Sequence, residues 1–171
     1  MLDLAARRRI VAAAEWLQRV PYDYSHSDDS WQNLYAPPAS LDCSSFVCRV
    51  ACEALGYSVG TLGTDANWLL DNLAHVTGGV PEPGDIVGYY RKAMTSMERL
   101  IAGPRVWHVM MFVGRDRITG RDTVVGACDL AGRVEVRPIV YEQHWGARRW
   151  RRIGEGIDPP APFRRLALRT V

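Results

Sequence analysis

The hydrophobic pattern of this chain changes its period once, at residues 81–85, and this change limits the folds that are open to it. Before Pro81 the apolar residues recur at helical spacing, whereas after Asp85 they form short runs or alternate, as strands do. Helices first and strands afterwards favour an α+β architecture, because consecutive strands pair readily as an antiparallel sheet on which the helices can pack. We therefore expect N-terminal helices packed on a C-terminal antiparallel β-sheet.

The expected elements follow from the pattern and from the residues that interrupt it. Asp3 can cap the first helix and Pro21 ends it. The helices are expected at residues 3–19, from Cys43 onward, and at 67–73. The strands are expected at residues 86–90, 106–113, 121–128, 133–137 and 150–153. Residues 91–105 read as an insertion between two strands, and the Pro-rich tail 158–171 as peripheral.

Composition excludes several classes of protein. The chain has 171 residues and a formal net charge of +2, so a single domain over residues 1–171 is expected, with no reason to predict a nucleic-acid or acidic-lipid partner. The arginine clusters at 7–9 and 148–152 are interpreted as solvated faces. No apolar run is long enough to span a bilayer, and polar residues interrupt the apolar stretch near the N-terminus. Without a signal peptide, the protein is expected to be cytoplasmic or delivered by another machine.

The four cysteines are expected to be reduced thiols. Three lie on the predicted second helix, where Cys48 and Cys52 are one turn apart and badly placed for a disulfide. The chain has no Cys-x-x-Cys pair and no cluster of histidines. We therefore expect neither a metal site nor a cofactor.

The reactive centre is predicted at Cys43, which follows Asp42 at the start of the second helix. The unpaired N–H groups and the positive dipole end of a helix N-terminus both favour a thiolate. The alternative is a small buried core residue, which is what free cysteines usually are. His108 near the start of the strand 106–113 can face such a sulfur across a helix–sheet boundary and act as its base. The other histidines fit less well, since they lie in predicted loops or at a helix end: His26, His75 and His144.

Residues 21–40 form a polar loop ahead of this helix that carries several aromatic side chains. Aromatic residues on a loop either line a binding groove or anchor the loop to the core. The sequence leaves both interpretations open for Tyr22, Tyr24, Trp31 and Tyr35.

Three short blocks resemble the NlpC/P60 family of cysteine peptidases in their residues, order and spacing. They are Asp42-Cys43-Ser44-Ser45-Phe46-Val47, Pro83-Gly84-Asp85-Ile86-Val87 and His108-Val109-Met110-Met111-Phe112-Val113-Gly114. Pro21-Tyr22 is similar to the upstream tyrosine of the family, and Val124-Val125-Gly126-Ala127 to the strand that follows its histidine. The resemblance covers about Ala5 to Ile153 and implies a papain-like α+β fold.

The resemblance also implies an activity and roles for individual residues. The family hydrolyses peptidoglycan stem peptides, usually between D-glutamate and a diamino acid, so the expected partner is a stem peptide or muropeptide. By position, Cys43 would be the nucleophile and His108 the general base. Asp42 would hold the free amine of the substrate, Ser44 would contact the substrate, and Tyr22 would lie near the oxyanion.

The chain departs from the family pattern at the third catalytic position, which aligns with Gly126. The family normally has a polar residue there to orient the histidine, and glycine has no side chain for that role. A backbone carbonyl, a water or Asp129 can replace it, and Asp129 is the side chain that we can name. Ser25-His26 also stands where the family has a glycine pair, and the 91–105 insertion is either a lid or a surface excursion.

Two functions from different classes follow. The first is an active cysteine peptidase or amidase acting on peptidoglycan stem peptides, with γ-D-glutamyl–diamino acid endopeptidase as the specific form. The second is a catalytically weak or inactive module on the same fold, which binds peptidoglycan or belongs to a phage-tail-like assembly. Acyl transfer with lipids on a related fold is a third alternative, although a carboxylate at Asp42 favours peptides.

Overall fold

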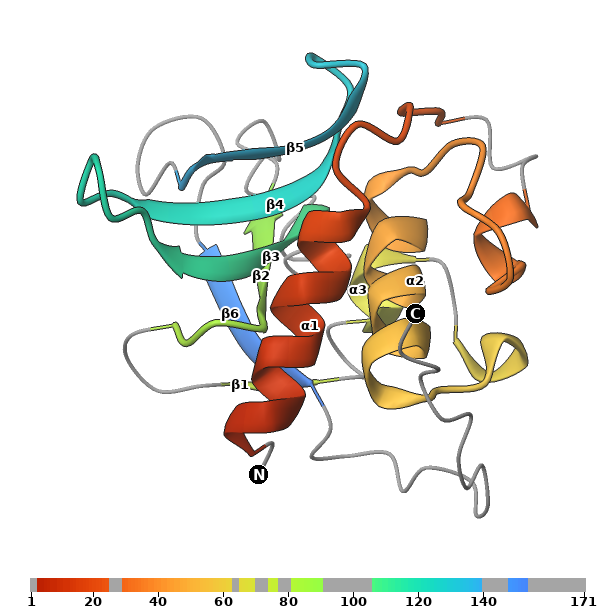
Figure 1. Ribbon diagram of the computed structural model, residues 1–171, viewed down its shortest axis with the longest axis horizontal. Helices are drawn as coiled ribbons and strands as arrows, with labels where there is room; N and C mark the ends of the chain where they lie inside the picture. Colours follow the sequence, from red (N-terminus) through yellow and green to blue (C-terminus); the bar gives the residue numbers. More distant parts are fainter. Residues whose placement is uncertain are drawn as a thin grey trace, which may run out of the picture.

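The protein packs helices on one side of an antiparallel sheet (Figure 1). The computed structural model describes residues 3–24, 29–62, 65–69, 74–76, 81–90, 106–139 and 148–153. The helices are α1 (Leu4–Trp16), α2 (Cys43–Leu55) and α3 (Ala66–Trp68), with 3-10 turns η1 (Asp29–Gln32) and η2 (Val59–Thr61). The strands are β1 (Ala74–Val76), β2 (Asp85–Tyr90), β3 (Val106–Arg115), β4 (Asp122–Cys128), β5 (Arg133–Pro138) and β6 (Arg148–Ile153). The expected α+β architecture is confirmed. The predicted insertion 91–105 and tail 158–171 lie outside the described residues.

The sheet has the strand order β1-β6-β2-β3-β4-β5, and every neighbouring pair is antiparallel. The segment after α1 extends it beyond β5, because the Arg19 N–H donates to the Val134 carbonyl (2.9 Å) and the Val134 N–H donates to the Val20 carbonyl (2.8 Å). Pro21 then bridges Arg133, in antiparallel fashion. The chain between the first two long helices is thus held against the sheet edge.

Helix α1 ends earlier than the sequence predicts. The Asp3 carboxylate caps its start by accepting the Ala6 N–H (2.6 Å), as expected. The helix stops at Trp16 rather than at Arg19, and Arg19 itself has a φ of 75°. The physical reason is the pairing with β5, because the Arg19 N–H donates to the Val134 carbonyl and not to a carbonyl of the helix.

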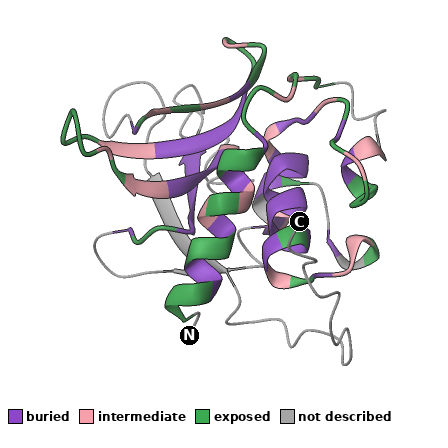
Figure 2. Cartoon of the chain, in the orientation of Figure 1, coloured by how far each residue is buried: buried purple, intermediate pink, exposed green. Residues whose placement is uncertain are grey.

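Helix α2 is the centre of the apolar core. Asp42 and Ser45 form a reciprocal capping box at its start, and Gly56 ends it in the left-handed conformation (φ 73°) that glycine adopts without strain. Its inward face packs on α1 and on strands β3 and β4 (Figure 2). Each large apolar side chain that it buries contributes about 1.5–3 kcal/mol. Fully buried residues of this helix include Phe46, Val47, Val50 and Ala51.

Strand β1 was not expected from the sequence. His75, which the pattern places at a helix end, lies in this strand and pairs with Arg152 of β6. A strand of three residues is too short for alternation to reveal it. Its existence depends on β6, which is more than 70 residues further along the chain.

The Pro83-Gly84-Asp85 block has a structural role. Asp85 is fully buried and pairs with Arg7 of α1 (Nη1 to Oδ1, 3.1 Å), whose Nη1 also donates to the Pro83 carbonyl (2.8 Å). Gly84 has a φ of 91° and lies against Ile10, so the turn requires a residue without a side chain. The interpretation of residues 7–9 as a solvated face is therefore wrong for Arg7, which joins the first helix to the second strand.

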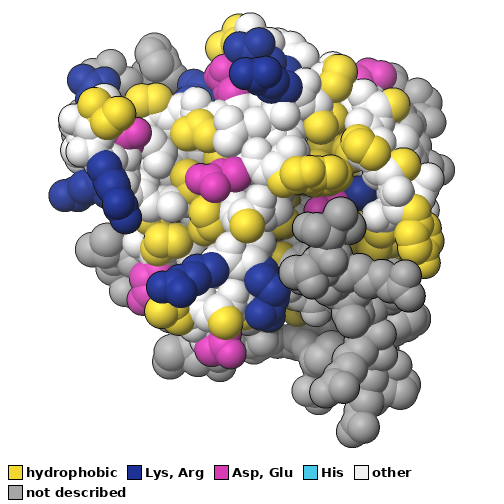
Figure 3. Space-filling model, viewed as in Figure 1, with side chains coloured by type: hydrophobic (Ala, Val, Ile, Leu, Met, Phe, Trp, Pro, Cys, Tyr) yellow, Lys and Arg dark blue, Asp and Glu magenta, His cyan; other side chains and the backbone are white. Residues whose placement is uncertain are grey.

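The surface shows no separation of charge on the face that carries the helices. Basic and acidic side chains are interspersed there with apolar ones, in agreement with the small net charge (Figure 3). Among the described helices, none has both the length and the apolar character needed to cross a membrane.

Candidate active site

Cys43 is the first residue of α2, and its thiol meets the sheet at β3. The backbone N–H of Val109 on β3 lowers the pKa of the thiol, as an N–H group directed at a sulfur does. Val109 directly follows His108, and its side chain packs in the core under α2, whereas adjacent side chains of a strand point to opposite faces of the sheet. The Cys43 residue is half-buried, whereas Cys48, Cys52 and Cys128 are buried, and all four cysteines are free. Helix α2 therefore packs on the strand that carries His108, while the pairing of the Cys43 thiol with the His108 imidazole stays a prediction.

Asp42 and Ser44 lie beside the thiol in a buried hydrogen-bond network. The carboxylate Oδ1 of Asp42 accepts the Ser45 N–H (2.7 Å) and the Ser44 hydroxyl (2.9 Å). Asp42 therefore caps α2 and fixes the orientation of Ser44 at the same time. The roles of Asp42 toward a substrate amine and of Ser44 toward the substrate stay predictions.

Tyr22 is held at the same site by backbone pairing. Its N–H donates to the Gly132 carbonyl (2.9 Å), and it forms a parallel bridge with Leu41, which precedes Asp42. Burial, with smaller contributions from the nearby Cys43, Asp129 and Asp42, raises the pKa of the Tyr22 hydroxyl to about 12. The phenol therefore keeps its proton at neutral pH and can donate a hydrogen bond.

His108 lies beside Tyr89 of β2, with ring centroids 6.2 Å apart. Both are on the outer face of the sheet, which is the face opposite helices α1 and α2. Burial lowers the pKa of its imidazole to about 4, and the Arg137 guanidinium acts in the same direction. The carboxylates of Asp129 and Asp42 oppose this shift without reversing it. The imidazole is therefore neutral at pH 7 and has a nitrogen that can accept a proton.

The expectation of a Cys43 thiolate is wrong for the resting protein. Burial raises the pKa of the thiol to about 11, and the Asp42 carboxylate adds to the increase. The N–H groups of Val109, Cys43 and Ser44 lower the pKa, as a helix start should, but their effect is smaller than the cost of removing a thiolate from water. The resting pair consists of a neutral thiol and a neutral imidazole.

These properties predict how the thiols react with iodoacetamide. We expect Cys43 to be alkylated faster than Cys48 or Cys52, because only the first is half-exposed and burial raises the pKa of Cys52 to about 12. Since thiolate is the reacting form, the Cys43 rate should rise about tenfold per pH unit from pH 7 to pH 10 and level off near its pKa of about 11. Mass spectrometry of peptides after timed labelling measures each rate. Equal, slow labelling of the three thiols contradicts an accessible nucleophile.

Gly126 on β4 leaves no room for an orienting side chain. A Cβ placed on it would lie 2.8 Å from Met110 Cγ and 2.9 Å from Met110 Cε. Met110 of β3 therefore fills the space that a polar side chain at position 126 would occupy. Asp129, at the end of β4, acts electrostatically on both His108 and Tyr22, so its carboxylate is close to the imidazole. Its role as the third catalytic residue stays a prediction.

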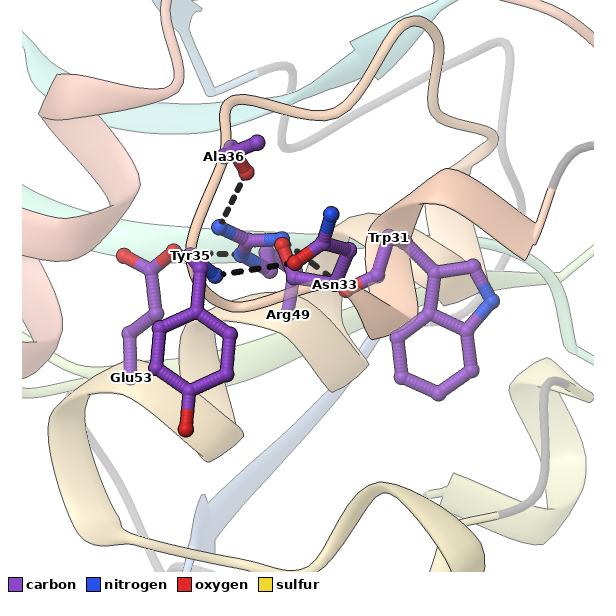
Figure 4. Close-up of polar contacts among 6 residues, drawn as sticks. All are labelled: Trp31, Asn33, Tyr35, Ala36, Arg49 and Glu53. Carbon is purple, nitrogen blue, oxygen red and sulfur yellow. Dashed lines mark hydrogen bonds and ion pairs between the residues drawn. The ribbon is translucent and has the colours of Figure 1, made fainter.

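The aromatic loop is anchored to the core, while the lining of a binding groove by its other aromatic side chains stays a prediction. Trp31 is buried in the core, whereas Tyr22 is at the site and Tyr35 is exposed. Arg49 of α2 holds the loop by donating from Nη1 to the carbonyls of Trp31 (3.1 Å) and Asn33 (2.8 Å), as Figure 4 shows. Its Nη2 donates to the Ala36 carbonyl (2.9 Å) and its Nε pairs with Glu53. The loop that leads into Cys43 is therefore fixed from inside.

Sequence reasoning missed Arg137, which the structure places near His108. The available signal was the alternation of Arg133, Glu135 and Arg137 on one strand, which puts the three side chains on one face of the sheet. Within the ranges that the structure describes, no three His, Cys, Asp or Glu side chains gather so as to hold a metal ion.

Comparison with known proteins identifies the class of fold. No family model matches the sequence, and a search of curated proteins finds no match either. The model is similar to solved structures of NlpC1 from Trichomonas vaginalis (TM-score 0.61, 17% identity, covering 90% of this chain and 46% of that one). It is also similar to the peptidoglycan hydrolase RipB from Mycobacterium tuberculosis (TM-score 0.55, 22% identity, covering 90% of this chain and 69% of that one). A third similar structure is an N-acetylmuramoyl-L-alanine amidase from Bacteroides uniformis (TM-score 0.60, 12% identity, covering 88% of this chain and 99% of that one).

The papain-like α+β fold of the NlpC/P60 proteins is the fold of this chain, as its sequence blocks predict. The chain spans less than half the length of several of these structures, including NlpC1 and NlpC2 from Trichomonas vaginalis.

Proposed function

We propose that this protein is a cysteine hydrolase that cleaves peptidoglycan stem peptides, with Cys43 as nucleophile and His108 as base. The observation that supports this most directly is the set of backbone N–H groups that act on the partly exposed Cys43 thiol, those of Val109, Cys43 and Ser44. The thiol concerned is partly exposed at the first residue of α2, and Val109 is the strand residue next to His108. A partly exposed thiol with N–H donors around it is suited to be a nucleophile.

The mechanism begins from neutral partners. As the Cys43 sulfur attacks the substrate carbonyl, the imidazole of His108 takes the thiol proton, forming a thioester after the amine leaves with that proton. Water then attacks the thioester with the imidazole again as base, which releases the acid and restores the thiol. The N–H groups at the α2 start and the protonated Tyr22 hydroxyl are suitable donors to the oxyanion of each tetrahedral intermediate.

The charges at the site support a peptide that carries an amine. Asp42 and Asp129 both act electrostatically on Tyr22 and His108, so two carboxylates border the reacting pair. A carboxylate close to the nucleophile suits an ammonium group of a substrate. Together with the fold shared with RipB, described as a peptidoglycan hydrolase, this favours the bond between D-glutamate and a diamino acid.

A catalytically weak or inactive peptidoglycan-binding module is the second candidate. The observation that favours it is the pair Gly126 and Met110, since the orienting position has no side chain and its space is filled. An imidazole without an orienting partner loses up to about four orders of magnitude in rate in hydrolytic triads. If Asp129 supplies the missing partner of the imidazole, the active hydrolase is favoured, and if it does not, the inactive module is favoured.

The test is the hydrolysis of a synthetic γ-D-glutamyl–diamino acid peptide, with products identified by mass spectrometry. We expect cleavage at the γ-glutamyl bond, and an Asp129→Asn variant should lower kcat about 10- to 100-fold, because the amide loses the charge that stabilises the imidazolium. The matched control is Asp116→Asn, since Asp116 belongs to the distant β3–β4 turn. Binding of the peptide without any cleavage supports the inactive module. Equal kcat for the Asp129 variant and the wild type removes Asp129 from the mechanism.

A further inference from the structure

Arg137 is a cation of the outer sheet face that reaches toward the site. It lies on β5 opposite Val124, and its Nη1 donates to the sulfur of Cys128 at 3.0 Å. Cys128 is opposite Arg133, four residues away from Arg137 along β5. The Arg137 side chain is therefore extended along β4, in the direction of the strand end where the site lies.

The guanidinium ends beside His108. Strands β3 and β4 pair at Met111 and Val125, and the next residues, Met110 and Gly126, are in contact as well. His108 comes two residues before Met110 on β3, and Cys128 comes two residues after Gly126 on β4. The alternation of side chains therefore puts both on the outer face, at the same end of the two strands. The electrostatic effect of Arg137 on His108 agrees with this position.

This cation has no counter-ion in the described part of the chain. Glu135 is two residues away on the same face of β5, yet no ion pair joins it to Arg137. A guanidinium has five N–H donors, and a thiol is a weak acceptor for one of them. Arg137 is half-buried, so its remaining donors are only partly solvated. A half-buried cation beside the His108 imidazole is suited to an anionic ligand.

We propose that Arg137 binds a carboxylate of the substrate next to the scissile amide. The substrate class is then a peptide that carries both a free carboxylate, for Arg137, and an ammonium group, for the side that Asp42 and Asp129 border. Arginine suits a carboxylate because its planar guanidinium donates two parallel hydrogen bonds. The inference rests on the proposed hydrolysis at Cys43, and it deepens that proposal by naming the anionic group that the site selects.

The first test compares two peptides that differ in one group, a γ-D-glutamyl peptide with a free α-carboxylate and the same peptide with an α-carboxamide. We expect the wild type to prefer the carboxylate about 10- to 100-fold in kcat/KM, since charged hydrogen bonds are about twice as strong as neutral ones. Arg137→Gln should bring the ratio close to 1, and Arg137→Lys should retain part of it. Arg117→Gln, on the far β3–β4 turn, should leave the ratio unchanged.

The second test does not depend on hydrolysis. Iodoacetate is an anion and iodoacetamide is neutral, so the ratio of their rates with Cys43 reports on the cation near the thiol. Arg137→Gln should lower this ratio about three- to tenfold at low salt, and Arg117→Gln should not change it. If neither peptide is cleaved but the ratio falls, the hydrolase proposal fails and the anion site stands.

The inference is overturned if Arg137→Gln changes neither the peptide preference nor the labelling ratio. Thermal unfolding checks that the variant is folded. If Arg137→Gln does not fold, Arg137→Lys is measured instead. A preference of this variant for the carboxylate peptide equal to that of the wild type then overturns the proposal that the guanidinium donates two parallel hydrogen bonds to the carboxylate.

Discussion

Replacing Cys43 by alanine is expected to lower the hydrolysis of a γ-D-glutamyl–diamino acid peptide by about 10⁴-fold or more, because the variant has no atom that can form the thioester. The change removes one sulfur from a half-exposed position at the start of α2. It leaves the Asp42 carboxylate, which caps the helix, in place. The fold should therefore survive, and circular dichroism with thermal unfolding verifies this.

The matched control for that variant is Cys52→Ala on the same helix. Cys52 lies on the opposite side of α2 from Cys43, nine residues further along, and its thiol is buried. Its removal should lower stability slightly through lost packing and leave kcat within about twofold of the wild type. Hydrolysis by Cys43→Ala at the wild-type rate rules out the cysteine mechanism. A loss of the same size in both variants indicates a structural effect instead.

Replacing Arg49 by methionine is expected to lower the free energy of unfolding by about 3–5 kcal/mol. Arg49 has 0% exposure, and its guanidinium satisfies the carbonyls of Trp31, Asn33 and Ala36 (Figure 4). Methionine fills most of the volume but donates no hydrogen bond, so these carbonyls and the Glu53 carboxylate lose their partner. Denaturant unfolding followed by fluorescence measures the change.

The comparison variant is Arg9→Met on α1. Arg9 is exposed and donates from Nε to the single carbonyl of Ala54 (3.0 Å), so its loss should cost less than about 1 kcal/mol. Arg49→Lys should fall between the two, because one ammonium group cannot reach all three carbonyls. If the midpoint shift of Arg49→Met is as small as that of Arg9→Met, the loop is not held in the way that we describe.

The candidate site was predictable to the extent that it depends on local sequence. Cys43 and His108 are each recognisable because short motifs and helical or strand periodicity surround them. Their state of charge was not predictable, because burial raises the pKa of the Cys43 thiol by more than the helix start lowers it, and burial also lowers the pKa of the His108 imidazole. Burial depends on the segments that pack around a group, and no local pattern reports on it.

Arginines illustrate the same limit more strongly. The sequence alone assigns Arg7 to solvent and is silent on Arg49 and Arg137. In the structure, Arg7 pairs with Asp85, Arg49 holds a loop, and Arg137 lies near His108. A long, flexible side chain can reach water or a buried partner from the same backbone position. The outcome is decided by which carbonyls and carboxylates the fold brings within reach.

By itself the sequence determined the order of the long helices and strands, the start of α2 and the class of fold, because periodicity, caps and short motifs act over a few residues. The tertiary structure alone decided that β1 exists, that Met110 fills the space over Gly126, and that a cation without a counter-ion ends near His108. These features come from pairing between segments that are far apart in the chain, and the energy of such contacts appears only once the sheet has formed.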